Sequence, residues 1–321
     1  MTPSVQLEPE AQAFVEAAPK LFDFSPKGGR AAFNQLQPGG VSALLVEVED
    51  RVIQGSPSGQ VAVRIIRPPS APAALPVLVY LHGGGWVSGG VQTHDRLVRE
   101  LALGVEAAVV FPVYSLSPEA KYPTAIEECY AVVDWVAEQG AQHGLDPERI
   151  AVIGDGVGGN MAAAVGLMAK ERGGPPIQRQ ALFYPVTDAA FETDSYRQFA
   201  EGYGLRRDLM RWAWDQYTIN VYERAEITAA PLRASIEQLT GLPPALIITS
   251  EADVLRDEGE AYARKLIAAG VRVTAVRFQA TIHGFLTLDT LATSAAARGA
   301  VTLAAGWLRD GFRGIETIPA P

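Results

Sequence analysis

A glycine-rich corner at residues 152–160 most strongly constrains what this chain can fold into. The segment reads Val-Ile-Gly-Asp-Gly-Val-Gly-Gly-Asn. An apolar, β-branched stretch at 149–153 leads into it, and a stretch rich in Ala, Leu and Met at 161–172 leads out. A strand, a sharp turn and a helix in this order are typical of the nucleophile elbow G-x-S-x-G. Both frame glycines are present, but Gly156 stands where the pattern has serine. The sequence therefore predicts a site for nucleophilic chemistry that lacks its nucleophilic side chain.

The rest of the chain alternates strand patterns with helix patterns. Strands are predicted at 44–53, 60–67, 76–81, 107–113, 149–153, 178–184, 245–250 and 271–278, and helices at 93–103, 123–143, 161–172, 257–269 and 294–312. The first two strands alternate in the manner of an antiparallel hairpin. The later strands alternate with helices, which favours right-handed crossovers and a parallel sheet. We therefore predict an α/β fold with about eight strands, mostly parallel, and helices on both faces.

Two regions interrupt this alternation. Residues 1–45 are helical in pattern and contain several aromatic residues, and residues 188–233 form an aromatic, helix-prone insert. Large aromatic side chains need a surface to bury against. We therefore expect both segments to form a cap over the main domain, whose core comprises residues 46–187 and 234–321.

A run of three glycines follows the predicted strand at 76–81, in the segment His-Gly-Gly-Gly-Trp. Acyl transfer needs backbone N–H donors aimed at a developing oxyanion, and consecutive glycines can turn these groups inward without side chains in the way. The elbow pattern adds the N–H that follows the nucleophile position, which here belongs to Val157. A flexible turn and a phosphate-binding loop are the alternatives. The sequence lacks the G-K-[ST] or G-x-G-x-x-G spacing of phosphate loops.

A carboxylate and a histidine follow the last two predicted strands. Asp253 comes just after the seventh strand, at the edge where α/β active sites lie, and His283 lies in the loop after the eighth. Their order, after the elbow, is that of an α/β-hydrolase triad. In such a triad the acid orients the histidine, which takes the nucleophile's proton. Asp257 is the competing carboxylate, but we expect it to cap the helix that begins there.

These motifs together resemble the hormone-sensitive-lipase-like family of α/β-hydrolases, the bacterial family IV carboxylesterases. The resemblance covers nearly the whole chain and rests on the segments His82–Trp86, Tyr114–Glu119, Tyr122–Pro123, Gly154–Asn160, Asp253–Asp257 and His283–Phe285. It implies an α/β-hydrolase fold with a helical cap, ester substrates with short-to-medium acyl chains, and neither a metal nor a cofactor. It also implies site residues: Asp253 as triad acid, His283 as general base, Asp155 as support for the elbow backbone, and Gly84, Gly85 and Val157 as oxyanion-hole donors.

Gly156 departs from the family pattern, and three interpretations are open. In the first, the chain is an esterase of this family whose serine has been replaced, and it is inactive or weakly active. In the second, it is a non-hydrolytic small-molecule-binding protein on the same scaffold. In the third, glycine is natural and His283 activates water directly. Retention of both Asp253 and His283 favours the first, because a neglected active site would usually lose them as well.

Three residues are expected to wall an apolar pocket for the acyl or alcohol part of the substrate: Trp86, Tyr203 and Leu205. Packing within the core or the cap is the alternative for each.

Charge and composition argue against several kinds of binding partner and favour one cellular location. The formal net charge is −9, which argues against nucleic acid and anionic membranes. No apolar run approaches the ~18 residues of a membrane span, and the N-terminus lacks the basic and apolar regions of a signal peptide, so we expect a cytoplasmic protein. The single cysteine, Cys129, excludes an internal disulfide framework and a Cys-rich metal site.

The strand at 271–278 is expected at a sheet edge, where pairing with a second copy would make a homodimer.

Overall fold

The computed structural model of the chain describes residues 5–17, 25–37, 44–69 and 74–314. Within these residues one sheet has eight strands in the order β1-β2-β4-β3-β5-β6-β7-β8. The strands are β1 (Glu47–Ser56), β2 (Gly59–Arg67), β3 (Leu75–Leu81), β4 (Ala108–Val113), β5 (Leu145–Asp155), β6 (Ile177–Phe183), β7 (Ala245–Ala252) and β8 (Val273–Ile282). β2 pairs antiparallel with β1 and β4, and the other neighbours pair parallel. This confirms the predicted α/β-hydrolase fold with its mostly parallel sheet.

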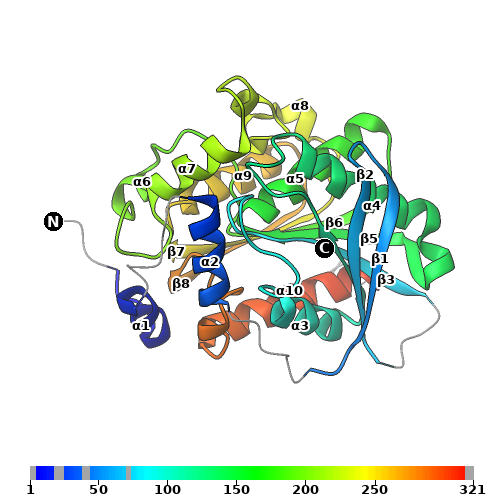
Figure 1. Ribbon diagram of the computed structural model, residues 1–321, viewed down its shortest axis with the longest axis horizontal. Coiled ribbons are helices and arrows are strands. Elements are labelled where there is room, and N and C mark those ends of the chain that lie inside the picture. Colours follow the sequence, from blue (N-terminus) through cyan, green and yellow to red (C-terminus); the bar gives the residue numbers. More distant parts are fainter. Residues whose placement is uncertain (1–4, 18–24, 38–43, 70–73, 315–321) are drawn as a thin grey trace, which may run out of the picture.

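Helices cover both faces of the sheet (Figure 1). On one face α3 (Asp95–Val105) packs against α10 (Ala295–Phe312), and the other face carries α4 (Thr124–Gln139), α5 (Val157–Arg172) and α9 (Arg256–Ala268). All seven residues of β3 are consequently buried. A strand covered on both faces reads as a continuous apolar run, which is why Leu75–Leu81 could be recognised. In β1, which is an edge strand of the sheet, most residues stay at least partly exposed.

The remaining helices belong to the N-terminal arm, the insert and the connections. They are α1 (Pro9–Ala17), α2 (Pro26–Leu36), α6 (Asp194–Gln198), α7 (Arg207–Tyr217), α8 (Ile236–Leu239), η1 (Gly140–His143), η2 (Glu223–Ala225), η3 (Pro231–Arg233) and η4 (Asp289–Leu291). Residues 1–4, 18–24 and 38–43 of the predicted arm lie outside the described residues. The helical character expected for the arm and for the insert is present in their described parts.

Two differences between predicted and observed helix starts bear on the site. α5 begins at Val157, four positions before the predicted 161, because the glycines after the corner continue directly into the helix. α9 begins at Arg256 with Leu255 at its N-cap, so the expected cap by Asp257 is wrong. The Asp257 carboxylate instead accepts a hydrogen bond from the Ser195 N–H at 2.7 Å, which ties α9 to α6 in the insert.

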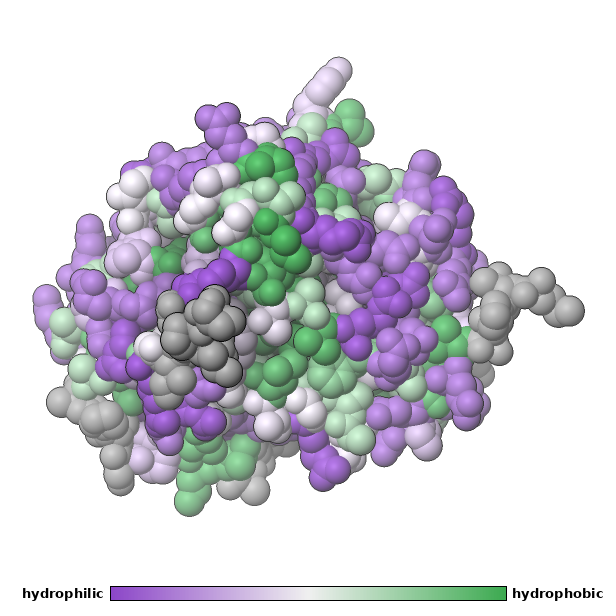
Figure 2. Space-filling view, turned by 180° about the vertical axis from the view of Figure 1, so that it is seen from behind, coloured by the Kyte–Doolittle hydropathy of each residue, from purple (hydrophilic) through white to green (hydrophobic). Residues whose placement is uncertain are grey.

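The surface is mixed in character. Seen from behind, hydrophilic side chains predominate around the rim and hydrophobic ones gather toward the middle (Figure 2). In the segment that follows α7, three large hydrophobic side chains are exposed: Ile219, Val221 and Tyr222. Among the described helices, none has both the length and the apolar character to cross a bilayer.

Candidate active site

The sharp turn predicted at the corner joins β5 to α5 through a single residue. Gly156 adopts φ 55° and ψ −117°, a conformation that glycine takes readily and other residues rarely do. Two positions on, Gly158 lies against the end of β3, where an added Cβ would overlap the Leu81 carbonyl oxygen. The helix can therefore approach the sheet this closely only with glycine there. The corner has the backbone of a nucleophile elbow, and its central residue carries no side chain.

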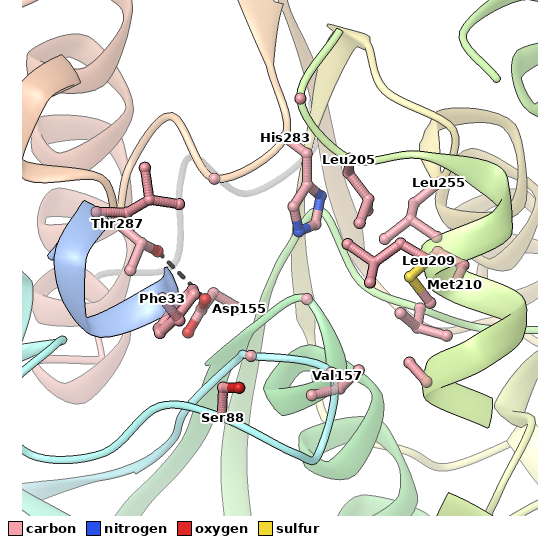
Figure 3. A pocket seen from close by; sticks show the side chains of 18 of the residues that line it. Phe33, Ser88, Asp155, Val157, Leu205, Leu209, Met210, Leu255, His283 and Thr287 are labelled. Carbon is pink, nitrogen blue, oxygen red and sulfur yellow. Dashed lines mark hydrogen bonds between the residues drawn. The ribbon is translucent and has the colours of Figure 1, made fainter. Parts of the chain in front are cut away.

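The His283 imidazole faces this corner. A Cβ built on Gly156 would lie 3.4 Å from His283 Nε2 and 3.6 Å from Cε1, and no other described atom outside its chain neighbours lies within 4 Å. A hydroxyl one bond further along a serine side chain could therefore reach the ring nitrogen. Figure 3 shows the imidazole pointing into the cavity above the corner.

The opposite side of the imidazole is held by Asp253. The His283 Nδ1 and Asp253 Oδ2 atoms are 2.8 Å apart, and the buried carboxylate also accepts a hydrogen bond from the Leu255 N–H at 3.0 Å. The Tyr184 ring packs edge-on against the imidazole, with centroids 4.7 Å apart. An ionised carboxylate can only accept a hydrogen bond, so the hydrogen lies on Nδ1 of His283. The other ring nitrogen, Nε2, then presents a lone pair to the corner. The structure thus brings Gly156, Asp253 and His283 together in the geometry of a triad.

The glycine loop forms the other wall of the corner. Gly84, Gly85 and Val157 all line the cavity. The loop is closed by the Ser88 N–H, which donates to the Gly84 carbonyl at 2.9 Å, and a Cβ at Gly84 would overlap the Ser88 carbonyl oxygen. Within the described part of the chain, the N–H groups of Gly84, Gly85 and Val157 have no hydrogen-bond acceptor. They are therefore available to a ligand, as an oxyanion hole requires. Their role in a reaction stays a prediction.

Asp155 joins three parts of the site beneath its floor. Its Oδ1 accepts hydrogen bonds from the Tyr80 hydroxyl at 2.8 Å and from the Gly83 N–H at 3.0 Å, and its Oδ2 accepts one from Thr287 Oγ1 at 3.2 Å. Burial raises the pKa of this carboxyl, but the nearby His94 and the donated hydrogen bonds outweigh burial and bring the pKa to about 2. The ionised carboxylate therefore links the elbow, the glycine loop and the His283 loop.

An apolar cavity opens above these groups (Figure 3). The core contributes Val157, Val186, Leu255 and Leu288, the N-terminal arm contributes Phe14, Phe33 and Leu36, and the insert contributes Leu205, Leu209, Met210, Trp212 and Ala213. In the described residues no group of three or more His, Cys, Asp or Glu side chains could hold a metal ion. Because its lining is mainly apolar, the cavity can hold an apolar molecule with one end at the His283 imidazole.

Of the three predicted pocket residues, only Leu205 lines this cavity. The structure corrects the expectation for Trp86, which is fully buried and stacks on Tyr217 with ring centroids 4.0 Å apart. Its left-handed backbone, at φ 60°, makes the sharp turn after the glycines. Tyr203 instead packs edge-on against Phe199, with centroids 5.1 Å apart. The sequence pattern did not single out Phe33 or Leu209 as pocket residues, although the apolar spacing of α7 was a usable signal.

Two side chains of the arm fasten α2 beside the cavity. The buried Gln37 side chain donates from Nε2 to the carbonyls of Thr93 at 2.8 Å and Thr287 at 2.7 Å, and its Oε1 accepts from the Asp289 N–H at 2.7 Å. Arg30 donates from Nε to the Val87 carbonyl at 2.8 Å. The arm is thereby attached both to the loop after His283 and to the segment after the glycine loop.

Comparisons with known proteins agree with this geometry. A family model described as alpha/beta hydrolase fold matches residues 78–287. Carboxylesterase NlhH of Mycobacterium tuberculosis is 39% identical over 255 residues, which cover 78% of this chain and 79% of the relative. The crystal structure of a thermostable esterase from Pseudomonas putida has a TM-score of 0.93 at 47% identity, covering 97% of this chain and 99% of that one. An esterase from Pyrobaculum calidifontis has a TM-score of 0.87 at 36% identity, covering 95% and 99%.

Proposed function

The chain belongs to the hormone-sensitive-lipase-like family of α/β-hydrolases, and on that premise we propose that it binds carboxylic esters with short-to-medium acyl chains in its apolar cavity. As the sequence stands, it hydrolyses them weakly or not at all, because Gly156 has no hydroxyl. The arm at 1–45 and the insert at 188–233 act as the cap, and the reaction uses neither a metal nor a cofactor.

One observation carries this proposal. The position of a Cβ on Gly156 lies 3.4 Å from His283 Nε2, while Nδ1 of the same ring is held 2.8 Å from buried Asp253. Free N–H groups of Gly84 and Val157 border the same point. These distances support a serine-hydrolase site in which only the nucleophilic side chain is missing.

With a serine at the corner, these groups support acyl transfer in two steps. His283 Nε2 takes the hydroxyl proton as the oxygen attacks the ester carbonyl, and the backbone N–H groups hold the negative charge of the tetrahedral intermediate. The imidazolium then protonates the departing alcohol, and water hydrolyses the acyl-enzyme by the same route. Asp253 keeps the ring in the tautomer that both steps require.

The test compares hydrolysis of p-nitrophenyl butyrate by the chain and by its Gly156→Ser variant. We expect the variant to gain several orders of magnitude in kcat/KM, because loss of the nucleophile costs about that much in serine hydrolases. The double variant Gly156→Ser/His283→Gln is the control and should lose most of this gain. A folded Gly156→Ser variant without added activity would overturn the proposal.

Non-hydrolytic binding is the second candidate. It is favoured by Gly156 itself, which has no hydroxyl with which to attack an ester in the cavity. In that case the Gly156→Ser variant would be folded but inactive, and the unchanged chain would bind a non-ester ligand with high affinity. Isothermal titration with a non-hydrolysable ketone analogue of the ester, beside polar non-ester ligands, separates the two candidates.

A further inference from the structure

The corner leaves His283 facing open cavity where a serine hydroxyl would otherwise lie. Only the two ring atoms Nε2 and Cε1 come within 4 Å of the built Cβ position at Gly156, among described atoms outside its chain neighbours. The Nε2 lone pair therefore points at a place that a small hydroxylic molecule can enter. The apolar side chains of Leu205, Leu209 and Leu255 line the cavity beside it.

We propose that this site uses a small primary alcohol, methanol in the simplest case, as an external acyl acceptor. The inference rests on the proposed function, since it needs an ester bound in the same cavity. Serine contributes a CH₂OH group to an elbow, and methanol is that group capped with hydrogen. The methanol oxygen can replace the missing hydroxyl next to Nε2, while its methyl group lies against the apolar wall.

The reaction is a single displacement. The methanol oxygen attacks the ester carbonyl and forms a new carbon–oxygen bond, while its proton moves to His283 Nε2. The negative charge on the former carbonyl oxygen is held by the N–H groups of the glycine loop and Val157. The intermediate then collapses, the bond to the original alcohol breaks, and the imidazolium returns the proton to that alcohol. The products are a methyl ester and the free alcohol, and no acyl-enzyme forms.

Size limits the acceptor. Non-bonded carbon atoms keep about 3.5–4.0 Å apart, so methanol lies further from the Gly156 Cα than a bonded Cβ would. A Cβ at the neighbouring Gly85 would already lie 3.4 Å from the Ala213 methyl group, so the wall on that side is close. We therefore expect methanol to be a better acceptor than 2-propanol.

The experiment incubates the chain with p-nitrophenyl butyrate and increasing methanol, and measures methyl butyrate by gas chromatography. Its two control variants are Gly156→Ala, whose methyl group takes the place beside Nε2, and His283→Gln, which removes the base. General-base assistance is worth about 10²–10⁴-fold. We expect methyl butyrate formation by the chain to saturate with methanol and to exceed that of both controls by at least about 100-fold.

The Gly156→Ser variant makes the outcomes distinguishable. Equal methyl butyrate formation by the chain and both controls, together with ester hydrolysis by Gly156→Ser, overturns this inference and leaves the proposed function standing. An inactive but folded Gly156→Ser variant overturns both. Formation that rises linearly with methanol in all three proteins is reaction in solution and likewise contradicts the inference.

Discussion

At the scale of single residues, the backbone of Gly156 predicts that exchanging this residue changes the chemistry of the site and leaves the fold intact. At φ 55° and ψ −117° a residue with a Cβ is strained, at a cost of about 1–3 kcal/mol. Glycine removes that strain. We therefore predict that the chain is at least as stable as its Gly156→Ser variant, with an equal or higher Tm in thermal unfolding. A lower Tm for the unchanged chain would show that the corner is not strained in the way its dihedral angles indicate.

His82 makes stability depend on pH. Burial and the charge of nearby His94 lower the pKa of this imidazole from 6.5 to about 3. Between these values the unfolded chain binds a proton that the folded chain does not, so stability falls as pH falls through that window. From pH 7 to pH 5 this single group removes about 2 kcal/mol of unfolding free energy. Asp155, with its pKa at about 2, does not titrate in that range.

The measurement is urea unfolding at both pH values for the chain and for His82→Gln. The variant loses stacking on Tyr114, where the ring centroids are 4.1 Å apart, so its stability is lower at either pH. Its loss between pH 7 and pH 5 should nevertheless be smaller by about 2 kcal/mol. If the pH dependence were the same in the variant, the pKa of His82 would not be lowered in the folded protein, which would contradict this prediction.

At the scale of elements, α2 forms part of the cavity wall, and Gln37 at its C-terminal end holds it against the core. Gln37 satisfies three backbone groups of two loops that are far apart in sequence. The Thr287 carbonyl keeps a hydrogen bond from Arg96, so Gln37→Ala leaves the Thr93 carbonyl and the Asp289 N–H unpaired. We predict that this variant lowers the unfolding free energy by at least about 1–3 kcal/mol, because each buried group left unpaired costs about that much. The matched control is Gln35→Ala, on the same helix and exposed, which should change stability by less than about 0.5 kcal/mol. Equal effects in denaturant titration would contradict this role of Gln37.

The elements also show how far the sequence could be interpreted. β3 and the second half of β5, from Ile150 to Ile153, are apolar runs that helices cover on both faces. Asp253 and His283 follow strands that end at the same edge of the sheet. These placements follow from local pattern and chain order. The cavity wall does not, since it depends on how α2 and α7 lie over the core. Trp86 was wrongly expected in the wall for a second reason. Its side-chain direction depends on a left-handed turn that the sequence alone does not specify.

At the scale of the whole molecule, β8 is one of the two edge strands of the sheet and pairs only with β7 among the described strands. The predicted edge position is thereby confirmed, although the strand spans 273–282 rather than 271–278. The Glu8 N–H donates to the Ala280 carbonyl at 2.9 Å, so the arm covers one end of this edge. The rest of an edge strand can offer backbone N–H and C=O groups to a second copy. We predict a homodimer through this edge, with the two β8 strands related by a two-fold axis. Sedimentation velocity at micromolar concentration tests it, and a single monomeric species would refute it.

We infer that the site lacks only the side chain of residue 156. The most direct test is intact-protein and peptide mass spectrometry after treatment with an alkyl fluorophosphonate, which modifies an activated serine hydroxyl. We predict that Gly156→Ser gains one phosphonyl group on the peptide containing residue 156, and that the unchanged chain gains none. An unmodified Gly156→Ser variant, or a modified serine elsewhere in the unchanged chain, would contradict the account.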